Sequence, residues 1–251
     1  MLQGRHALVT GGGRGIGRVV AAALSRAGAV VTVAGRQETT LSQAVSCGDA
    51  NGYVVADVTD ERALSQGLAR AAAARGAIDI LIANAGGAES APFAKTDPEL
   101  FRRMFELNVM GVVHAIRAVL DEMMARQSGR IVAVASTAGL KGYAYVSAYC
   151  AAKHAVVGLV RALAIETATA GVTVNAVCPG YTDTELVRDS VARIGDKTGR
   201  SREEVLADML KQNPLRRLIA PEEVAAAVLY LCSPQAAAVT GTTLAVAGGE
   251  V

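Results

Sequence analysis

Three residues in the middle of the chain have side chains and a spacing suited to proton transfer. Tyr149 and Lys153 are four residues apart, and Ser136 precedes the tyrosine by thirteen. In a helix, residues i and i+4 share a face, so we expect the lysine ammonium beside the phenol. A neighbouring positive charge favours the phenolate, so the pKa of Tyr149 is expected to fall from about 10 toward neutrality. Such a phenol can exchange a proton with a substrate at working pH.

Ordinary amphipathic helices with a surface lysine show the same Tyr-x-x-x-Lys spacing. Other motifs must therefore decide whether these residues are catalytic. Thr10 to Gly17 reads TGGGRGIG, directly after an expected strand and at the start of an expected helix. Glycines let a backbone approach a pyrophosphate closely, and a helix N-terminus stabilises its negative charge. The strand–helix context is the one that this kind of motif requires, so the segment predicts dinucleotide binding.

Strand-like and helix-like segments alternate along the chain. Strands are expected at residues 6–10, 30–34, 53–56, 79–83, 130–135, 172–178 and 242–247, and helices at 15–27, near 41, 60–74, 97–126, 145–169 and 221–231. This alternation is typical of a parallel sheet with right-handed crossovers and helices on both faces. We therefore expect an α/β fold: one Rossmann-like domain over residues 1–251 with a doubly wound, parallel, seven-stranded sheet.

One stretch breaks the alternation, because about forty residues between Pro179 and Pro221 contain no expected strand. Two helices are expected there, at 182–195 and 201–212, with a break at 195–199. An excursion of this length is often a functional lid, so a helical lid is predicted over about 182–213. The alternative is a pair of packed surface helices without a functional role.

The order of these motifs resembles that of the single-domain short-chain dehydrogenase/reductases. The resemblance rests on the T-G-x-x-x-G-x-G segment, Asn84-Ala85-Gly86, Ser136, Tyr149-x-x-x-Lys153 and Pro179-Gly180, and it runs from about Gly4 to Gly249. It implies an NAD(P)-dependent enzyme that acts on CH–OH groups. Within the family, the long lid region resembles 3-oxoacyl thioester reductases and 3-hydroxybutyrate or 3-hydroxyacyl-CoA dehydrogenases.

The resemblance also implies catalytic roles. Tyr149 would be the proton donor in reduction and the base in oxidation. Lys153 would lower the pKa of that phenol and bind the nicotinamide ribose. Ser136 would donate a hydrogen bond to the carbonyl oxygen, where charge develops. Asn108 would complete a tetrad by holding a water that links Lys153 to solvent.

A set of cofactor-binding residues follows from the same resemblance. It comprises Gly11, Arg14, Gly15, Ile16, Gly17, Arg36, Asp57, Val58, Asn84, Ala85, Gly86, Tyr149, Lys153, Pro179, Gly180, Thr182 and Thr184. Asp57 and Val58 should border the adenine. Pro179, Gly180 and Thr184 should line the nicotinamide carboxamide.

The choice between the two nicotinamide cofactors depends on charge. NAD-binding members usually end the second strand with an acid that holds the adenosine ribose. Here Gly35 and Arg36 stand at that place. Arg36 and Arg14 could both pair with a 2′-phosphate, so NADP(H) is favoured and NAD(H) is the alternative. Arg36 could also be a solvated loop residue, in which case selectivity would be loose.

The expected substrate wall is largely apolar. It comprises Ala138, Leu140, Tyr143, Tyr145, Val146, Tyr181, Leu186 and Val187. Hydroxybutyrate enzymes of the family usually carry a histidine two residues after the serine and a lysine three residues before the tyrosine. Here Ala138 and Val146 occupy these places, so a carboxylate would find no cation there. Lys141 and Arg188 are candidate substitutes, although surface roles suit both.

The sequence leaves several substrate classes possible. Family reductases that act on acyl-carrier protein often have a basic residue just before the sixth strand, where this chain has Ala170. The lid holds six Lys/Arg and seven Asp/Glu, so it is no basic patch. A coenzyme A thioester is preferred, with a neutral ketone or secondary alcohol as the alternative. A non-catalytic dinucleotide sensor would typically lose Tyr149 or Lys153, and an extended-branch epimerase or dehydratase would need a C-terminal substrate domain.

Composition limits the partners. The net charge of +2 does not suggest nucleic acid or a membrane surface, and no uninterrupted apolar run reaches about 18 residues. His6, His114 and His154 show no metal-ligand spacing, so no metal is expected. The four cysteines form no C-x-x-C pair and no signal peptide is visible, which predicts a cytoplasmic protein with reduced thiols. The resemblance implies a homotetramer, built through the helices ending near Arg126 and Thr169 and through residues 248–251.

Overall fold

Seven parallel strands form the centre of the structure, a computed structural model that describes residues 2–251. They are β1 (His6–Thr10), β2 (Val30–Gly35), β3 (Gly52–Val55), β4 (Ile78–Ala83), β5 (Gly129–Val134), β6 (Val172–Pro179) and β7 (Thr243–Val246). Their order is β3-β2-β1-β4-β5-β6-β7, and every neighbouring pair is parallel. The predicted fold class is confirmed. The strand order reverses between β1 and β4, where doubly wound sheets bind ligands beyond their carboxyl ends.

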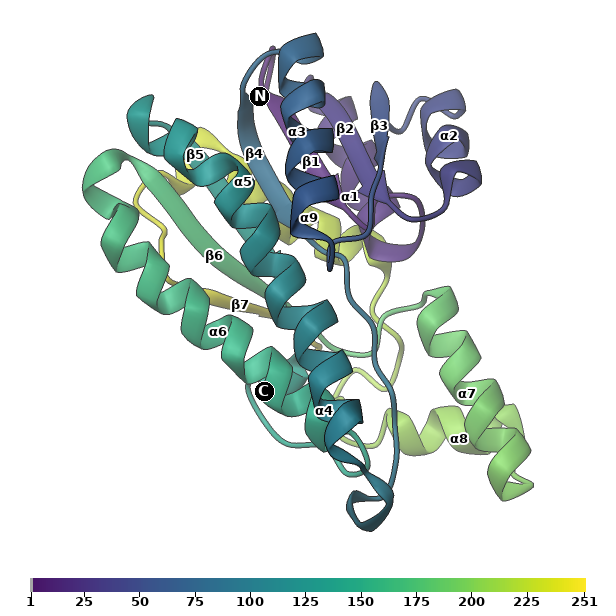
Figure 1. Cartoon of the computed structure of the whole chain (residues 1–251). Helices are drawn as coiled ribbons and strands as arrows, with labels where there is room; N and C mark the ends of the chain where they lie inside the picture. The colour runs from purple at the N-terminus through teal and green to yellow at the C-terminus, as the bar shows by residue number, and fades with distance from the viewer. Residues whose placement is uncertain (1) are drawn as a thin grey trace.

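Helices cover both faces of this sheet (Figure 1). On one face α1 (Gly15–Arg26) packs against α9 (Pro221–Cys232), with α2 (Glu38–Ser46) beside β2 and β3. On the other face lie α3 (Glu61–Arg75), α5 (Gly111–Ala125) and α6 (Ser147–Thr167). Successive strand residues alternate between two cores: Leu8 belongs to the α3/α5/α6 side and Val9 to the α1/α9 side. Strands that are buried on both faces explain the aliphatic runs in the sequence.

The helix predicted over 97–126 is divided by a π-helical turn. It consists of α4 (Pro98–Phe105), the π turn Glu106–Met110 and α5. Asn108 lies in the π turn, and its Nδ2 donates to the Met104 carbonyl at 3.0 Å and to the Gly87 carbonyl at 2.9 Å. In a regular α-helix the Met104 carbonyl would accept the Asn108 backbone N–H. The side chain is bonded to that carbonyl instead, and it ties the helix to a distant loop.

The helix predicted over 145–169 begins two residues later, as α6. Tyr145 has a left-handed backbone (φ 67°), and its carbonyl accepts a hydrogen bond from the Ala91 N–H at 2.8 Å. This conformation cannot continue into a helix. By length and composition the segment Ser147–Ala170 could cross a membrane, but buried core helices meet the same criterion, and α6 packs along β6.

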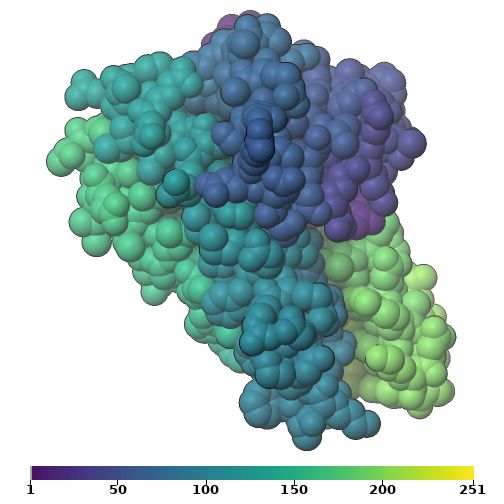
Figure 2. Space-filling view, in the orientation of Figure 1, coloured from purple at the N-terminus to yellow at the C-terminus, as the bar shows by residue number. Residues whose placement is uncertain are grey.

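The predicted lid region contains α7 (Glu185–Thr198) and α8 (Arg202–Met209). Residues 182–184 are not helical, because Thr182 pairs with Ile219 in an isolated parallel bridge. In Figure 2 the light-green atoms of this region form a projection beside the teal atoms around α4. The movement of these helices as a lid stays a prediction.

Candidate active site

The loop between β1 and α1 has a backbone that only glycine suits. Gly11 and Gly15 have left-handed φ values of 64° and 53°. A Cβ at Gly17 would lie 2.3 Å from the Gly11 carbonyl oxygen and 2.4 Å from Asn84 Nδ2. Asn84 Nδ2 also donates to the Thr10 carbonyl at 2.9 Å, which holds the loop to the end of β4. Since the first turn of α1 carries no acid, its N-terminus fits an anionic pyrophosphate.

The segment after β6 lies across from this loop. A Cβ at Gly15 would be 3.5 Å from Cγ2 of Thr184. Within the segment, the Thr182 hydroxyl donates to the Gly180 carbonyl at 3.0 Å, and the Thr184 hydroxyl lies 3.4 Å from the Thr182 carbonyl. The structure therefore brings the predicted pyrophosphate and nicotinamide segments together. A dinucleotide that spans both fits the residues present.

Ser136, Tyr149 and Lys153 lie where β5 and α6 meet beyond the sheet edge. Ser136 follows β5, and its Oγ accepts from the Ala138 N–H at 3.1 Å, which fixes the serine at the start of a 3₁₀ turn. Tyr149 and Lys153 stand on the first turns of α6, with the lysine Nζ 5.7 Å from the centre of the phenol ring. The predicted sharing of one helix face is confirmed.

Asn108 reaches the same place from another element. A Cβ at Gly86 would lie 2.7 Å from Asn108 Oδ1 and 3.6 Å from Lys153 Nζ. Asn108 Oδ1 accepts from the Gly87 N–H at 3.2 Å. The asparagine thus joins the π turn to the loop after β4, next to the lysine. All four residues of the predicted tetrad meet here, and the water-holding role of Asn108 stays a prediction.

The pKa of Tyr149 is raised, whereas the sequence predicted that it would be lowered. Burial raises it to about 12, although a hydrogen bond with Ser136 acts in the opposite direction. Because burial outweighs the other effects, the expected fall toward neutrality is wrong in this structure. The Lys153 ammonium lies 5.7 Å from the centre of the phenol ring and donates to the Val134 carbonyl at 2.8 Å. Burial also lowers the pKa of Lys153, to about 8. At pH 7 the phenol is therefore neutral and the lysine charged, which is the state that can give a proton to a ketone.

The predicted phosphate-selecting arginines lie at the rim. Arg36 Nη1 is 3.8 Å from Asp57 Oδ2, and the arginine side chain is 70% exposed. Such a long, exposed ion pair contributes little and is easily exchanged for another anion. Arg14 is exposed at the N-cap of α1. Val58 is buried beneath α5, so of the pair expected beside the adenine, Asp57 has the exposed side chain.

The predicted substrate wall is partly assembled. The rings of Tyr143 and Tyr181 meet edge to face, with centroids 6.2 Å apart. Ala138 is buried, while Leu140 and Val146 are half-buried. Tyr145 is 67% exposed and Leu186, on α7, is 45% exposed. The places of Leu186 and its neighbour Val187 in the wall stay predictions.

Glu250 is a residue of this region that the sequence reasoning missed. Its side chain is 1% exposed and lies 3.2 Å from Lys141 Nζ, and its Oε1 is 2.6 Å from the Tyr143 hydroxyl. Lys141 is therefore engaged inside the protein, whereas Arg188 forms an exposed pair with Asp183 at 3.2 Å. The available signal was the pair of glycines before Glu250, which permits the chain to turn inward.

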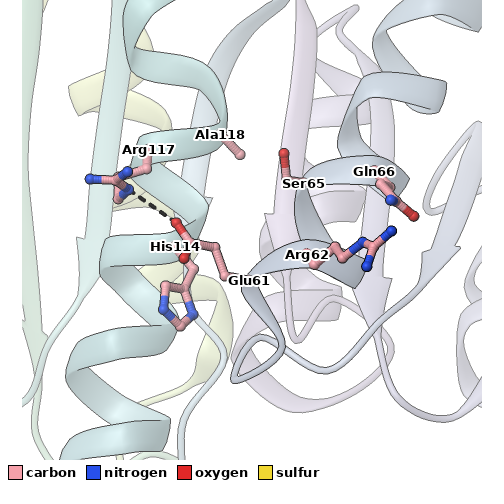
Figure 3. Close-up of a pocket in the computed structure, with 7 residues that line it drawn as sticks. All are labelled: Glu61, Arg62, Ser65, Gln66, His114, Arg117 and Ala118. Atoms are coloured by element: carbon pink, nitrogen blue, oxygen red, sulfur yellow. Dashed lines mark hydrogen bonds and ion pairs between the residues drawn. The ribbon is translucent and has the colours of Figure 1, made fainter.

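A surface hollow between α3 and α5 is separate from this site (Figure 3). It is lined by Glu61, Arg62, Ser65, Gln66, His114, Arg117 and Ala118. An ion pair between Glu61 and Arg117 spans it at 3.0 Å. None of the predicted catalytic, cofactor or substrate residues lines it. Among residues 2–251, no three His, Cys, Asp or Glu side chains gather as a metal site.

Comparisons with known proteins agree with this geometry. The family model described as short chain dehydrogenase matches residues 5–194. The cis-4-hydroxycyclohexanecarboxylate dehydrogenase of Sinomonas cyclohexanicum is 41% identical over 249 residues, covering 98% of this chain and 96% of the relative. The acetoacetyl-CoA reductase of Rhizobium meliloti (strain 1021) is 39% identical over 250 residues, 98% of each chain.

Among solved structures, a variant of actinorhodin polyketide ketoreductase with NADPH has a TM-score of 0.94 and 35% identity, covering 100% of this chain and 99% of that one. The chain belongs to the short-chain dehydrogenase/reductase family. It is an NAD(P)-dependent oxidoreductase that acts on ketone and alcohol groups.

The glycine loop leads to a stability prediction. We expect Gly17→Ala to lower the free energy of unfolding by about 1–3 kcal/mol, because the methyl group must displace loop backbone. Gly142→Ala, in the loop before α6, is the control, since an added Cβ there meets nothing within 4 Å. That change should raise the free energy of unfolding by roughly 0.4–1 kcal/mol, because alanine restricts the unfolded chain. Urea denaturation measures both, and equal stabilities would contradict the packing argument.

The buried lysine leads to a pH-dependent prediction. Lys153 has a pKa of about 8 in the fold and 10.5 as its ordinary value, so its charge destabilises the fold fully below pH 8. This penalty is lost as pH rises from 8 to 10.5. Lys153→Met should therefore be more stable than the parent at pH 7. The expected gain is roughly 1–3 kcal/mol once the lost hydrogen bond has been subtracted, and it should shrink by pH 10. Denaturation at both pH values tests this, with exposed Lys197→Met as control; a less stable Lys153→Met at pH 7 would be inconsistent with it.

Proposed function

We propose that this protein is an NADP(H)-preferring enzyme that interconverts 3-oxoacyl and 3-hydroxyacyl thioesters of the coenzyme A type. The observation that carries the proposal is the meeting of Ser136, Tyr149, Lys153 and Asn108 beside the loop after β4. The neighbouring Ala138 and Val146 supply no cation, which suits an acyl chain without a free carboxylate.

The chemistry follows from the protonation states. In reduction, Ser136 donates a hydrogen bond to the ketone oxygen and Tyr149 transfers its proton to it. The nicotinamide of NADPH, when bound, supplies the hydride to the carbonyl carbon. The charge of Lys153 stabilises the phenolate left behind. In the reverse direction the same phenolate takes the hydroxyl proton.

Two relatives and the charges near the nucleotide loop support the substrate class and the cofactor. A relative of 39% identity is named acetoacetyl-CoA reductase, and a structural neighbour of 35% identity was solved with NADPH. Arg14 and Arg36 are exposed near the predicted adenosine end, and β2 ends in Gly35 rather than an acid. NAD(H) use is the alternative for the cofactor.

A neutral ketone or secondary alcohol is the second candidate substrate. The 41% identical relative favours a ring alcohol over a thioester, and the alcohol in its name also carries a carboxylate. Parallel assays with acetoacetyl-CoA and cyclohexanone derivatives would separate the two classes. A sensor without catalysis would bind the cofactor and turn over neither.

Assembly and location are also proposals. A homotetramer would cover the outer face of α6, where Ile165 is 81% exposed beside the open surface at Gly158. A reducing cytoplasm suits the thiols, since Cys150, Cys178 and Cys232 are buried and unpaired. Sedimentation of the purified chain would test the assembly.

Tyr149→Phe tests the mechanism. We expect kcat for ketone reduction to fall by about 10²–10⁴-fold, because the proton donor is removed while the ring remains. NADPH binding, measured by fluorescence titration, should stay within a few-fold of the parent. The exposed Tyr230→Phe serves as control. Turnover that is unchanged in Tyr149→Phe would refute the proposed role.

Arg36→Ala tests the cofactor preference. The guanidinium is expected to pair with the 2′-phosphate, which NADH lacks, so the Kd for NADPH should rise about tenfold or more while that for NADH changes little. Arg62→Ala on α3 removes the same charge at an exposed position away from the nucleotide loop. Equal weakening of both cofactors would rule out a phosphate-selecting arginine.

A further inference from the structure

The end of the chain turns back into the protein after β7. Gly248 and Gly249 have left-handed φ values of 63° and 86°. A Cβ at Gly248 would lie 2.4 Å from Asn213 Oδ1, and one at Gly249 would lie 3.3 Å from Pro214 Cγ. This tight turn against the base of the lid region directs the Glu250 side chain inward, where it is 1% exposed.

Glu250 binds the ammonium of Lys141, the cation next to the expected substrate wall. Lys141 Nζ lies 3.2 Å from Glu250 Oε1, 3.2 Å from the Glu250 carbonyl oxygen and 2.8 Å from Gln212 Oε1. An ammonium has three N–H donors, and these three oxygens account for all of them. A substrate carboxylate could bind Lys141 only by displacing a buried carboxylate or breaking the contact with Gln212.

Glu250 is also linked, through Tyr143, to the part of the substrate wall next to the catalytic residues. Its Oε1 accepts from the Tyr143 hydroxyl at 2.6 Å, and that hydroxyl lies 2.7 Å from Thr137 Oγ1, one residue after Ser136. The negative charge of Glu250 helps to raise the pKa of Tyr143, after burial as the main cause. A continuous set of contacts therefore joins the carboxylate to the residue beside the catalytic serine.

The second oxygen of this carboxylate has no partner. Glu250 Oε2 is buried, and among residues 2–251 it is one of two buried side-chain atoms without a hydrogen bond, the other being Thr173 Oγ1. It lies 3.2 Å from the position of a Cβ on Gly180, in the segment predicted to line the nicotinamide. A buried carboxylate oxygen without a hydrogen bond is costly, so Oε2 is left unsatisfied where the substrate is expected, while Lys141 pairs with Oε1.

We propose that Glu250 is a specificity-determining residue that excludes ketones whose acyl group ends in a carboxylate and admits those whose acyl group is a neutral ester or thioester. It acts in two ways. It keeps Lys141 from pairing with a substrate anion, and it places its own negative charge next to Tyr143, whose ring packs against Tyr181. The inference rests on the proposed function, since it concerns the substrate of that site.

The test uses two probes with the same reacting ketone, acetoacetate and its ethyl ester, on the full chain. Glu250→Gln keeps the shape and an oxygen that can accept from Tyr143, but it removes the charge. We expect the ratio of kcat/KM for ester over acid to fall about tenfold or more, chiefly through a lower KM for the acid. Adding Lys141→Met to Glu250→Gln should remove this gain, because the freed ammonium is then missing.

Controls separate charge from structure. Glu222→Gln makes the same charge change at an exposed position on α9 and should leave the ratio unchanged. If Glu250→Gln does not fold, Glu250→Ala replaces it, since it also lacks the side-chain carboxylate. A ratio within twofold of the parent in the folded variant, or the same shift in Glu222→Gln, overturns the inference.

Binding distinguishes this inference from the proposed function. In the Tyr149→Phe background, where reduction is expected to be lost, quenching of protein-bound NADPH fluorescence by the two probes reports affinity without turnover. Charge discrimination in binding that Glu250→Gln removes, when the parent reduces neither the probes nor acetoacetyl-CoA, would support the inference while contradicting the proposed function. Turnover of the ester with an unchanged ratio would do the opposite.

Discussion

The active-site arrangement depends on one buried positive charge, the ammonium of Lys153. It is 4% exposed and donates to the carbonyl of Val134, the last residue of β5. Removing an ammonium from water is unfavourable, and here that lowers its pKa to about 8. The surroundings must therefore fix the lysine, because a mobile charge would return to solvent. The long helix α6, the end of β5 and the loop at Gly86 together provide this support.

The same sheet edge gathers the other functional groups for a simple geometric reason. The carboxyl ends of parallel strands lie together, so the segments after β1, β4, β5 and β6 converge although they are far apart in sequence. Asn84 bonds the first of these segments to the second, and Asn108 bonds the second to the π turn. Buried polar networks of this kind hold their members in one arrangement when every member is satisfied. These hydrogen bonds lie where the nucleotide and the proton donor are expected, and the irregular backbone of the π turn supports them.

Much of this arrangement was predictable from the sequence. The aliphatic runs predicted all seven strands, and the four-residue spacing placed Tyr149 and Lys153 on one helix face. The π turn at Asn108 was not predictable, because it depends on bonds to Gly87, 21 residues away. The pKa of Tyr149 was predicted in the wrong direction, since pattern shows neighbouring charge but not burial. Glu250 was missed because its contact with Tyr143 joins residues 107 positions apart.

The roles proposed for two charged groups, Lys153 and Glu250, would together favour a substrate whose acyl group is neutral. In the proposed mechanism, Lys153 supports proton transfer to an oxygen at the end of β5, and its charge is needed there as the phenol ionises. Glu250 lies on the other side of Tyr143 and holds the second lysine, Lys141, away from incoming anions. A substrate anion would otherwise have a choice between two ammonium groups, and binding at the catalytic one would misplace the carbonyl. If Glu250 has the proposed role, Lys141 is neutralised and one carboxylate oxygen stays unpaired. The reacting ketone oxygen is then the part of a neutral substrate that the catalytic groups would attract most strongly.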